Sequence, residues 1–179
     1  MAVLSKTKLK SLVGKHKDFP KKGITFLDLN PILYSSAART AILNDFVKNI
    51  GINSKTVIVA PEARGFIWGI IIAEKLRIPF IPIRKKGKLP GRVISQYYDL
   101  EYGSDSLHIQ DLGKKFKGYN VVIVDDLLAT GGTAAACAQL VTKIGGNVSA
   151  FYFVINIEAL NGKEILKQYS NTIYTTLRF

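Results

Sequence analysis

The chain has 179 residues, of which 47% are apolar, and this length and composition predict one globular domain with a hydrophobic core. Lys and Arg total 25 against 13 Asp and Glu, and the net charge of +12 favours polyanionic partners: nucleic acid, anionic lipid or a phosphorylated substrate. There is no run of about 18 uncharged apolar residues, no signal-peptide pattern and only one cysteine, Cys137, so we expect a cytoplasmic protein without a membrane span or an internal disulfide.

The first fifty residues are predicted to contain two helices joined by a loop. Leucines with helical spacing indicate a short amphipathic helix in residues 5–15. A loop is expected over residues 19–31, because a Phe-Pro dipeptide interrupts the helical pattern. Residues 36–50 form the second predicted helix, with Ser36 as its N-cap.

A buried strand at residues 56–60 leads into a turn of small residues at 61–65 and a helix at 66–76. The N-terminus of such a helix binds anions through its free backbone amides. Arg64 adds a positive charge and a planar guanidinium that matches phosphate oxygens. The alternative is that Arg64 only pairs with Glu62 at the surface.

The next region is predicted to hold a short strand at residues 79–83 and a mobile loop at 84–92, which is basic and interrupted by Gly and Pro. The chain is expected to return as a strand within residues 93–102. Another strand is expected at residues 107–110, with His108 as a surface residue rather than a catalyst.

The most informative stretch begins with four β-branched apolar residues at 121–124, which predict a strand buried on both faces of a parallel sheet. Two adjacent carboxylates, Asp125 and Asp126, are expected to end this strand, where ligands gather in open α/β sheets. A tight turn at residues 130–133 then leads into a helix that is expected to run to about Ile144.

Two glycines in that turn, Gly131 and Gly132, permit positive φ and leave backbone amides accessible to a ligand. These amides and the helix N-terminus form a cradle for one phosphate. With the carboxylates nearby as acceptors for hydroxyls, ribose 5-phosphate is the simplest matching ligand. The spacing fits neither a P-loop nor a Rossmann fingerprint. The alternative is that these residues serve folding alone.

The C-terminal part is predicted to contain a long strand at residues 148–157, a helix ending near 168 and a last strand at 172–176. Strands that alternate with helices imply right-handed βαβ crossovers and a mostly parallel twisted sheet flanked by helices. The predicted fold class is therefore α/β, in one domain over residues 1–179.

The stretch at residues 121–133 resembles the phosphoribosyl-pyrophosphate motif of the type I phosphoribosyltransferases, and three further stretches are similar to the adenine phosphoribosyltransferases among them. These stretches are residues 18–28, 62–66 and 88–103. The resemblance implies the type I phosphoribosyltransferase fold, with a small N-terminal hood at about 1–34 and a flexible lid loop at about 84–103.

The resemblance also implies an activity. It is the transfer of phosphoribosyl from 5-phosphoribosyl 1-pyrophosphate to adenine, which gives AMP and pyrophosphate in purine salvage. Mg²⁺ is the expected cofactor and a homodimer the expected assembly, with neither nucleic acid nor a membrane as partner. Lid closure would exclude water from a reactive sugar cation.

The resemblance assigns roles residue by residue. The pyrophosphate is expected to contact three cations: Arg64, Arg84 and Lys88. Ribose hydroxyls, and Mg²⁺ indirectly through ribose or water, are expected at two acids: Asp125 and Asp126. The 5′-phosphate is expected at the turn: Ala129, Thr130, Gly131, Gly132 and Thr133.

The base is expected at Thr25, Phe26, Leu27 and Leu127, where the hood segment reads adenine largely through backbone groups. The family usually has arginine where this chain has Leu27. Glu101 matches the family's catalytic loop position and is expected to interact with the purine N7 edge as an acid or hydrogen-bond partner.

Three alternatives stay open at this point. Another enzyme of the fold, acting on hypoxanthine, guanine or xanthine, would keep the central motif and differ in the hood and lid. A regulator would retain the fold without catalysis, but it would carry an added DNA-binding domain. A basic RNA-binding module would bind unrelated RNA with a steep salt dependence.

Overall fold

The computed structural model describes residues 4–100 and 103–179. Its internal contacts divide the chain into two compact units, residues 1–48 and 49–179. The expectation of one domain over the whole chain stays a prediction. Within the two described ranges, no helix combines the length and the apolar character needed to cross a membrane.

The N-terminal unit contains three helices and an antiparallel hairpin: α1 (Lys6–Leu12), β1 (Gly14–Lys17), β2 (Thr25–Asp28), α2 (Asn30–Tyr34) and α3 (Ser36–Asn49). Both predicted helices are confirmed, but the predicted loop at 19–31 is partly wrong, because β2 and the first two residues of α2 lie inside it. The predicted N-cap is also wrong by one residue. Ser35 caps α3, since its hydroxyl accepts a hydrogen bond from the Ala38 amide at 3.2 Å.

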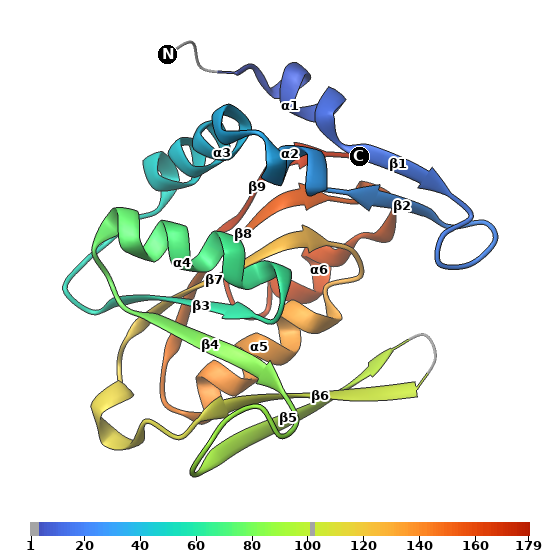
Figure 1. The fold of residues 1–179 in the computed structure, drawn as a ribbon. Helices are drawn as coiled ribbons and strands as arrows, with labels where there is room; N and C mark the ends of the chain where they lie inside the picture. The colour runs from blue at the N-terminus through green and yellow to red at the C-terminus, as the bar shows by residue number, and fades with distance from the viewer. Residues whose placement is uncertain (1–3, 101–102) are drawn as a thin grey trace. The chain divides into compact units, whose positions relative to one another are not determined.

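The C-terminal unit is a seven-stranded sheet in the order β5-β6-β4-β3-β7-β8-β9 with helices on its faces (Figure 1). Its strands are β3 (Thr56–Pro61), β4 (Phe80–Lys85), β5 (Val93–Leu100), β6 (Gly103–Gln110), β7 (Asn120–Leu128), β8 (Asn147–Asn156) and β9 (Ile173–Arg178). Its helices are α4 (Arg64–Leu76), α5 (Gly132–Lys143) and α6 (Gly162–Leu166). Strands β4, β3, β7, β8 and β9 pair in parallel, whereas β5 and β6 are antiparallel, so the predicted mostly parallel α/β sheet is confirmed.

The connections place a topological switch point between β3 and β7. From β3 the chain passes through α4 to β4 on one side, and from β7 it passes through α5 to β8 on the other. Because such crossovers are right-handed, the two helices cover opposite faces of the sheet, as Figure 1 shows. The loops after β3 and β7 therefore diverge at their carboxyl ends and leave a crevice there.

Strand β7 supplies the centre of the core. Val121, Val122, Ile123 and Val124 are at most 1% exposed, which confirms a strand buried on both faces. The predicted end of this strand is wrong, because β7 continues through both acids to Leu128. Pairing with β8 maintains it there, with Asp125 opposite Phe153 and Leu128 opposite Asn156.

Only the first two residues of the predicted mobile loop at 84–92 belong to a strand, and the strand expected within residues 93–102 is confirmed. Strand β4 extends to Lys85, and residues 93–100 form β5, which pairs with β6 in a hairpin that packs against α5. The Lys143 ammonium of α5 donates to the Ser95 carbonyl oxygen of β5 at 3.0 Å. The flexibility of the lid at 84–103 stays a prediction.

His108 is 7% exposed, so the expectation of a surface histidine is wrong. Its Nδ1 lies 2.8 Å from the Ser95 hydroxyl and its Nε2 lies 3.0 Å from the Ser106 hydroxyl. These two serine contacts satisfy both ring nitrogens, which gives His108 a structural place in the hairpin.

Candidate active site

A cavity of about 530 Å³, part of it open to solvent, lies at the switch point. Its lining joins the first residue of α4 to the end of β7 and the first turn of α5: Arg64, Asp125, Asp126, Leu127, Leu128, Ala129, Thr130, Gly131, Gly132, Thr133 and Ala134. The structure therefore brings together every residue expected to hold the phosphoribosyl group. It adds to them one of the three cations expected at the pyrophosphate.

The two carboxylates of this cavity are held in different surroundings. The Asp126 side chain is 5% exposed, and its Oδ2 lies 2.8 Å from Nε of Arg64. Asp125 Oδ1 accepts a hydrogen bond from the Asp126 amide at 2.8 Å. Asp126 therefore contacts the Arg64 guanidinium, whereas Asp125 contacts the backbone amide of Asp126.

Burial raises the pKa of Asp125 well above its ordinary range, and the adjacent charge of Asp126 raises it further. Burial also raises the pKa of Asp126, although the Arg64 charge opposes this effect. Ionised carboxylates are therefore disfavoured here until a ligand supplies hydroxyl donors or positive charge.

Gly65 is the residue that lets α4 begin so close to these acids. A Cβ added at Gly65 would lie 3.0 Å from Asp125 Oδ1 and 3.2 Å from the Val124 carbonyl oxygen. Any side chain at this position would therefore press on β7 at the point where the carboxylates begin.

The turn after β7 is the segment that is expected to hold the phosphate. Gly131 has φ 88° and is the N-cap residue of α5. Because it has no side chain, the space in front of the first amides of the helix is not filled by a capping group. Backbone amides and the positive end of α5 thus face a cavity of suitable size for a phosphate.

Gly162 at the start of α6 supports this turn, and sequence reasoning missed it. A Cβ at Gly162 would overlap the Ala129 carbonyl oxygen and lie 3.0 Å from the Gly131 amide nitrogen. In return, a Cβ at Gly131 would lie 2.6 Å from the Gly162 carbonyl oxygen. The Asn161-Gly162 dipeptide is a turn signal, but nothing in it indicates which segment it contacts.

The other two cations expected at the pyrophosphate lie at the end of β4, outside the lining of that cavity. Arg84 Nε is 2.7 Å from Glu62 Oε2, and Arg84 Nη1 donates to the Lys88 carbonyl oxygen at 3.3 Å. Burial tends to raise the pKa of Glu62, but hydrogen bonds from Arg84 and from the Lys85 amide lower it overall. Glu62 therefore pairs with Arg84 and Arg64 with Asp126, which disfavours a surface pair of Arg64 with Glu62 as the reason for Arg64.

The residues expected at the base fall in two places. Leu127 lines the cavity, whereas Thr25, Phe26 and Leu27 lie on β2 of the N-terminal unit. There the Leu27 residue is 7% exposed and the Thr25 residue is exposed. Glu101 lies outside the described residues.

The donor set at the cavity suits a hard cation that brings most of its own ligands. Asp125 and Asp126 offer carboxylate oxygens, and within residues 4–100 and 103–179 no group of three or more His, Cys, Asp or Glu side chains could hold a metal ion. Mg²⁺ characteristically uses one or two protein carboxylates together with waters and substrate phosphates. The residues present therefore fit Mg²⁺ bound mainly through a substrate.

Known proteins resemble this chain in sequence. A family model described as the phosphoribosyl transferase domain matches residues 33–169. The adenine phosphoribosyltransferase of Methanococcus vannielii is 50% identical over 153 residues, which are 86% of this chain and 88% of that protein.

Two crystal structures of adenine phosphoribosyltransferases have the same fold. The structure from Thermoanaerobacter pseudethanolicus has a TM-score of 0.90 and 41% identity, and the match covers 98% of this chain and 100% of that one. The structure from Saccharomyces cerevisiae, complexed with an imino-altritol bisphosphate and adenine, has a TM-score of 0.85 and 34% identity over 96% of this chain and 98% of that one.

Proposed function

The chain belongs to the adenine phosphoribosyltransferases of the phosphoribosyl transferase family, and on that premise we propose the work of each part of its site. The reaction is phosphoribosyl transfer from 5-phosphoribosyl 1-pyrophosphate to adenine, with AMP and pyrophosphate as products. The observation that carries the assignment is one cavity that combines two buried carboxylates, a guanidinium and a glycine turn at a helix N-terminus.

The phosphoribosyl group occupies the end of β7 and the turn that follows. Asp125 and Asp126 accept hydrogen bonds from the ribose hydroxyls, and residues 129–133 hold the 5′-phosphate with backbone amides and hydroxyl groups. These contacts fix the sugar at both ends, so that its C1 atom is held in line between the incoming base and the departing diphosphate.

The leaving group carries growing negative charge as the C1–oxygen bond breaks. Arg64, Arg84 and Lys88 stabilise that charge, and pyrophosphate draws Arg64 from Asp126 and Arg84 from Glu62. Asp125 and Asp126 would hold Mg²⁺ indirectly, through ribose or water, and the bound ion would supply further positive charge to stabilise the leaving group.

Adenine is bound by Thr25, Phe26 and Leu27 of the hood and by Leu127. The Leu27 side chain is apolar and offers the base no polar group, so polar contacts with the base are assigned to backbone groups of the hood segment. Glu101 supplies an acid or hydrogen-bond partner at the N7 edge. Backbone readout makes specificity independent of the arginine that the family usually has at this position.

A pyrophosphate-release assay with a panel of purine bases tests the activity and the base assignment together. Adenine presents a donor at C6 and an acceptor at N1, and hypoxanthine presents the opposite pattern. Two mismatched groups at about 1–3 kcal/mol each give roughly 10²–10⁴-fold discrimination in kcat/KM. Reaction of hypoxanthine within tenfold of adenine would contradict backbone readout.

The alternatives make different predictions in the same experiment. A fold relative acting on another base would prefer hypoxanthine, guanine or xanthine, and a non-catalytic binder would release no pyrophosphate. An RNA-binding module would bind unrelated RNA, with an affinity that falls steeply with salt. We also propose a homodimer in the cytoplasm, on family resemblance, and light scattering of the purified protein checks the assembly.

A further inference from the structure

The β5–β6 hairpin extends beyond the strand that holds it in the sheet. Strand β6 pairs with β4 as far as Lys85 opposite Leu107, where β4 ends. The outer half of the hairpin, residues 97–100 and 103–106, continues past this point, and its two strands pair with each other. Glu101 belongs to the connection between them and lies outside the described residues. The outer half is therefore positioned by side-chain contacts rather than by backbone pairing with β4.

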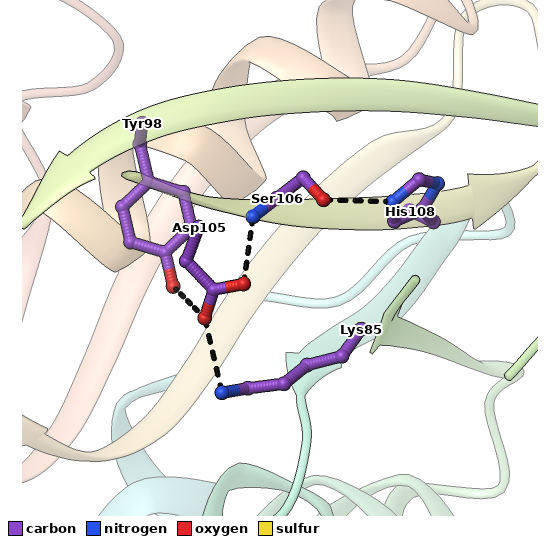
Figure 2. Close-up of polar contacts among 5 residues, drawn as sticks. All are labelled: Lys85, Tyr98, Asp105, Ser106 and His108. Atoms are coloured by element: carbon purple, nitrogen blue, oxygen red, sulfur yellow. Dashed lines mark hydrogen bonds and ion pairs between the residues drawn. The ribbon is translucent and has the colours of Figure 1, made fainter. Parts of the chain in front are cut away.

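One side chain of the outer half, Asp105, contacts three neighbours, and Figure 2 shows Lys85 and Tyr98 converging on its carboxylate. The Lys85 ammonium lies 3.0 Å from Asp105 Oδ2, and the Ser106 amide donates to Asp105 Oδ1 at 2.8 Å. The Tyr98 hydroxyl, from the opposite strand of the hairpin, donates to Asp105 Oδ2 at 3.5 Å, which is a long hydrogen bond. Asp105 thus joins β4, β5 and β6 just beyond the last backbone pair of β4 and β6.

The charges at this contact are matched. The hydrogen bond from Lys85, together with that from the Ser106 amide, lowers the pKa of Asp105, and the hydrogen bond to Asp105 raises the pKa of Lys85. Both groups are therefore charged at neutral pH, and their attraction strengthens the hydrogen bond. The Lys85 side chain is 56% exposed, so solvent screens the pair. A contact of this strength favours one position of the hairpin severalfold without making the hairpin rigid.

Lys85 has a different task from its neighbour Arg84. Adjacent residues of a strand point to opposite faces of the sheet. Arg84 pairs with Glu62 at 2.7 Å, whereas Lys85 pairs with Asp105 at 3.0 Å. The end of β4 therefore carries one cation expected at the pyrophosphate and one that holds the hairpin. We propose that Asp105 is a positioning residue for Glu101, which acts by tying the outer half of the hairpin to Lys85 at the end of β4.

The inner half of the hairpin has attachments of its own. The Lys143 ammonium of α5 donates to the Ser95 carbonyl oxygen of β5 at 3.0 Å. At the end of the hairpin away from its tip, Arg92 Nε lies 3.0 Å from Asp111 Oδ2. Loss of the Asp105 carboxylate should therefore loosen the outer half and leave the inner half in place.

This assignment rests on the proposed function, because that function makes Glu101 the catalytic residue. The test is Asp105→Asn, which keeps the size of the side chain and removes its charge. Asp111→Asn is the matched control, since it breaks a similar ion pair at the other end of the hairpin. Single-turnover formation of AMP measures the chemical step, calorimetry measures the dissociation constants of ribose 5-phosphate and pyrophosphate, and circular dichroism checks folding.

Asp105→Asn is expected to lower the single-turnover rate about 3- to 5-fold, the effect of one exposed ion pair, and to leave both dissociation constants unchanged. Asp111→Asn should change none of these quantities. Lys85→Met should lower the rate as much as Asp105→Asn does, and the double variant should be no slower than either one, because both substitutions break the same contact. In a Glu101→Gln background the effect of Asp105→Asn should disappear, since the carboxylate to be positioned is absent.

Weaker binding of ribose 5-phosphate or pyrophosphate, an equal loss of rate in Asp111→Asn, or an effect that persists beside Glu101→Gln would show a merely structural role and overturn the proposal. If Glu101→Gln lowers the rate and Asp105→Asn does not, this assignment alone is wrong. If Glu101→Gln has no effect, or if the wild-type protein makes no AMP from adenine and phosphoribosyl pyrophosphate, the function proposed for Glu101 and this assignment fall together.

Discussion

The β3–α4 and β7–α5 units share one plan: a buried parallel strand, a short turn and a helix that begins at the switch point. They differ in how their charges are balanced. After β3, Glu62 has a guanidinium partner at 2.7 Å and a lowered pKa. At the end of β7, Asp125 and Asp126 lie side by side, and burial raises the pKa of both.

This difference separates a charge that supports the fold from charges that await a ligand. Glu62 gains stability from the protein's own cation, so its ionised form is favoured without a substrate. Two adjacent carboxylates that share one partially exposed arginine gain much less, and burying charge without full compensation is unfavourable. The unfavourable burial of these two carboxylates therefore marks the end of β7 as a candidate functional site more clearly than the cavity alone.

Neutralising the two acids of β7 is the strongest test of the claim that they serve a ligand rather than the fold. Asp125→Asn with Asp126→Asn should lower turnover by more than about 10³-fold and weaken phosphoribosyl pyrophosphate, because the ribose hydroxyls lose their charged acceptors. Steady-state kinetics with Mg²⁺, together with circular dichroism to check folding, measure this. Near-normal kinetics in a folded double variant would remove the ribose assignment.

Glu101 belongs to neither the β3–α4 segment nor the β7–α5 segment. Its substitution should therefore leave unchanged the binding of the ligands proposed for those two segments. Glu101→Gln is expected to lower kcat by about 10²-fold, the usual contribution of one proton-transfer partner. The dissociation constants of ribose 5-phosphate and pyrophosphate should stay unchanged, since the effect arises in the transition state. An unchanged single-turnover rate in a folded variant would demote Glu101 to a solvated residue.

Much of this arrangement could be predicted from the sequence where one segment determines its own environment. Residues 121–124 are apolar and β-branched and are buried as expected. The glycine turn that follows lines a cavity with Asp125 and Asp126. Local patterns sufficed because strand, turn and helix are contiguous, and the parallel sheet brings residues 64 and 126 together by its topology alone.

The misses have a common physical origin in partners that lie far away in sequence. His108 looked exposed because nothing local shows that Ser95 lies across the hairpin from it. The end of β7 was misplaced because acids rarely continue a buried strand, whereas pairing with β8 holds this one. The β1 strand was missed because three of its four residues are exposed, which leaves no alternation to detect.

Gly162 offers a test of the turn in the β7–α5 unit that leaves every charge in place. In Gly162→Ala the new Cβ meets the Ala129 carbonyl oxygen, so the cradle must shift. We expect about tenfold weaker ribose 5-phosphate and a loss of about 1–3 kcal/mol in unfolding free energy, as for overpacking elsewhere. Gly51→Ala is the control, since a Cβ there has nothing within 4 Å; equal effects of both substitutions would contradict the role of Gly162.

Asp125→Asn should separate activity from stability. The pKa of Asp125 is raised above its ordinary value of 3.8. The contribution of this carboxyl group to the free energy of unfolding is therefore fully present below pH 3.8 and is lost as pH rises through the folded-state pKa. The amide avoids that loss, and the variant should be about 0.5–2 kcal/mol more stable at pH 7. Urea unfolding across pH should show this gain vanish in acid; a less stable variant at pH 7 would mean that the carboxylate is compensated after all.

Glu62→Gln is the matched change in the β3–α4 unit, and its effect should have the opposite sign and be the smallest. The pKa of Glu62 is lowered from its ordinary value of 4.5, so the ionised form contributes stability above 4.5 that is lost as pH falls through the folded pKa. The Arg84 side chain is 36% exposed, and solvent screening limits the pair to no more than about 1 kcal/mol. Urea unfolding at pH 7 should therefore find Glu62→Gln slightly less stable than the wild type, with the gap closing in acid. A gain in stability at pH 7, as expected for Asp125→Asn, would show that the two strand ends carry their charges in the same way.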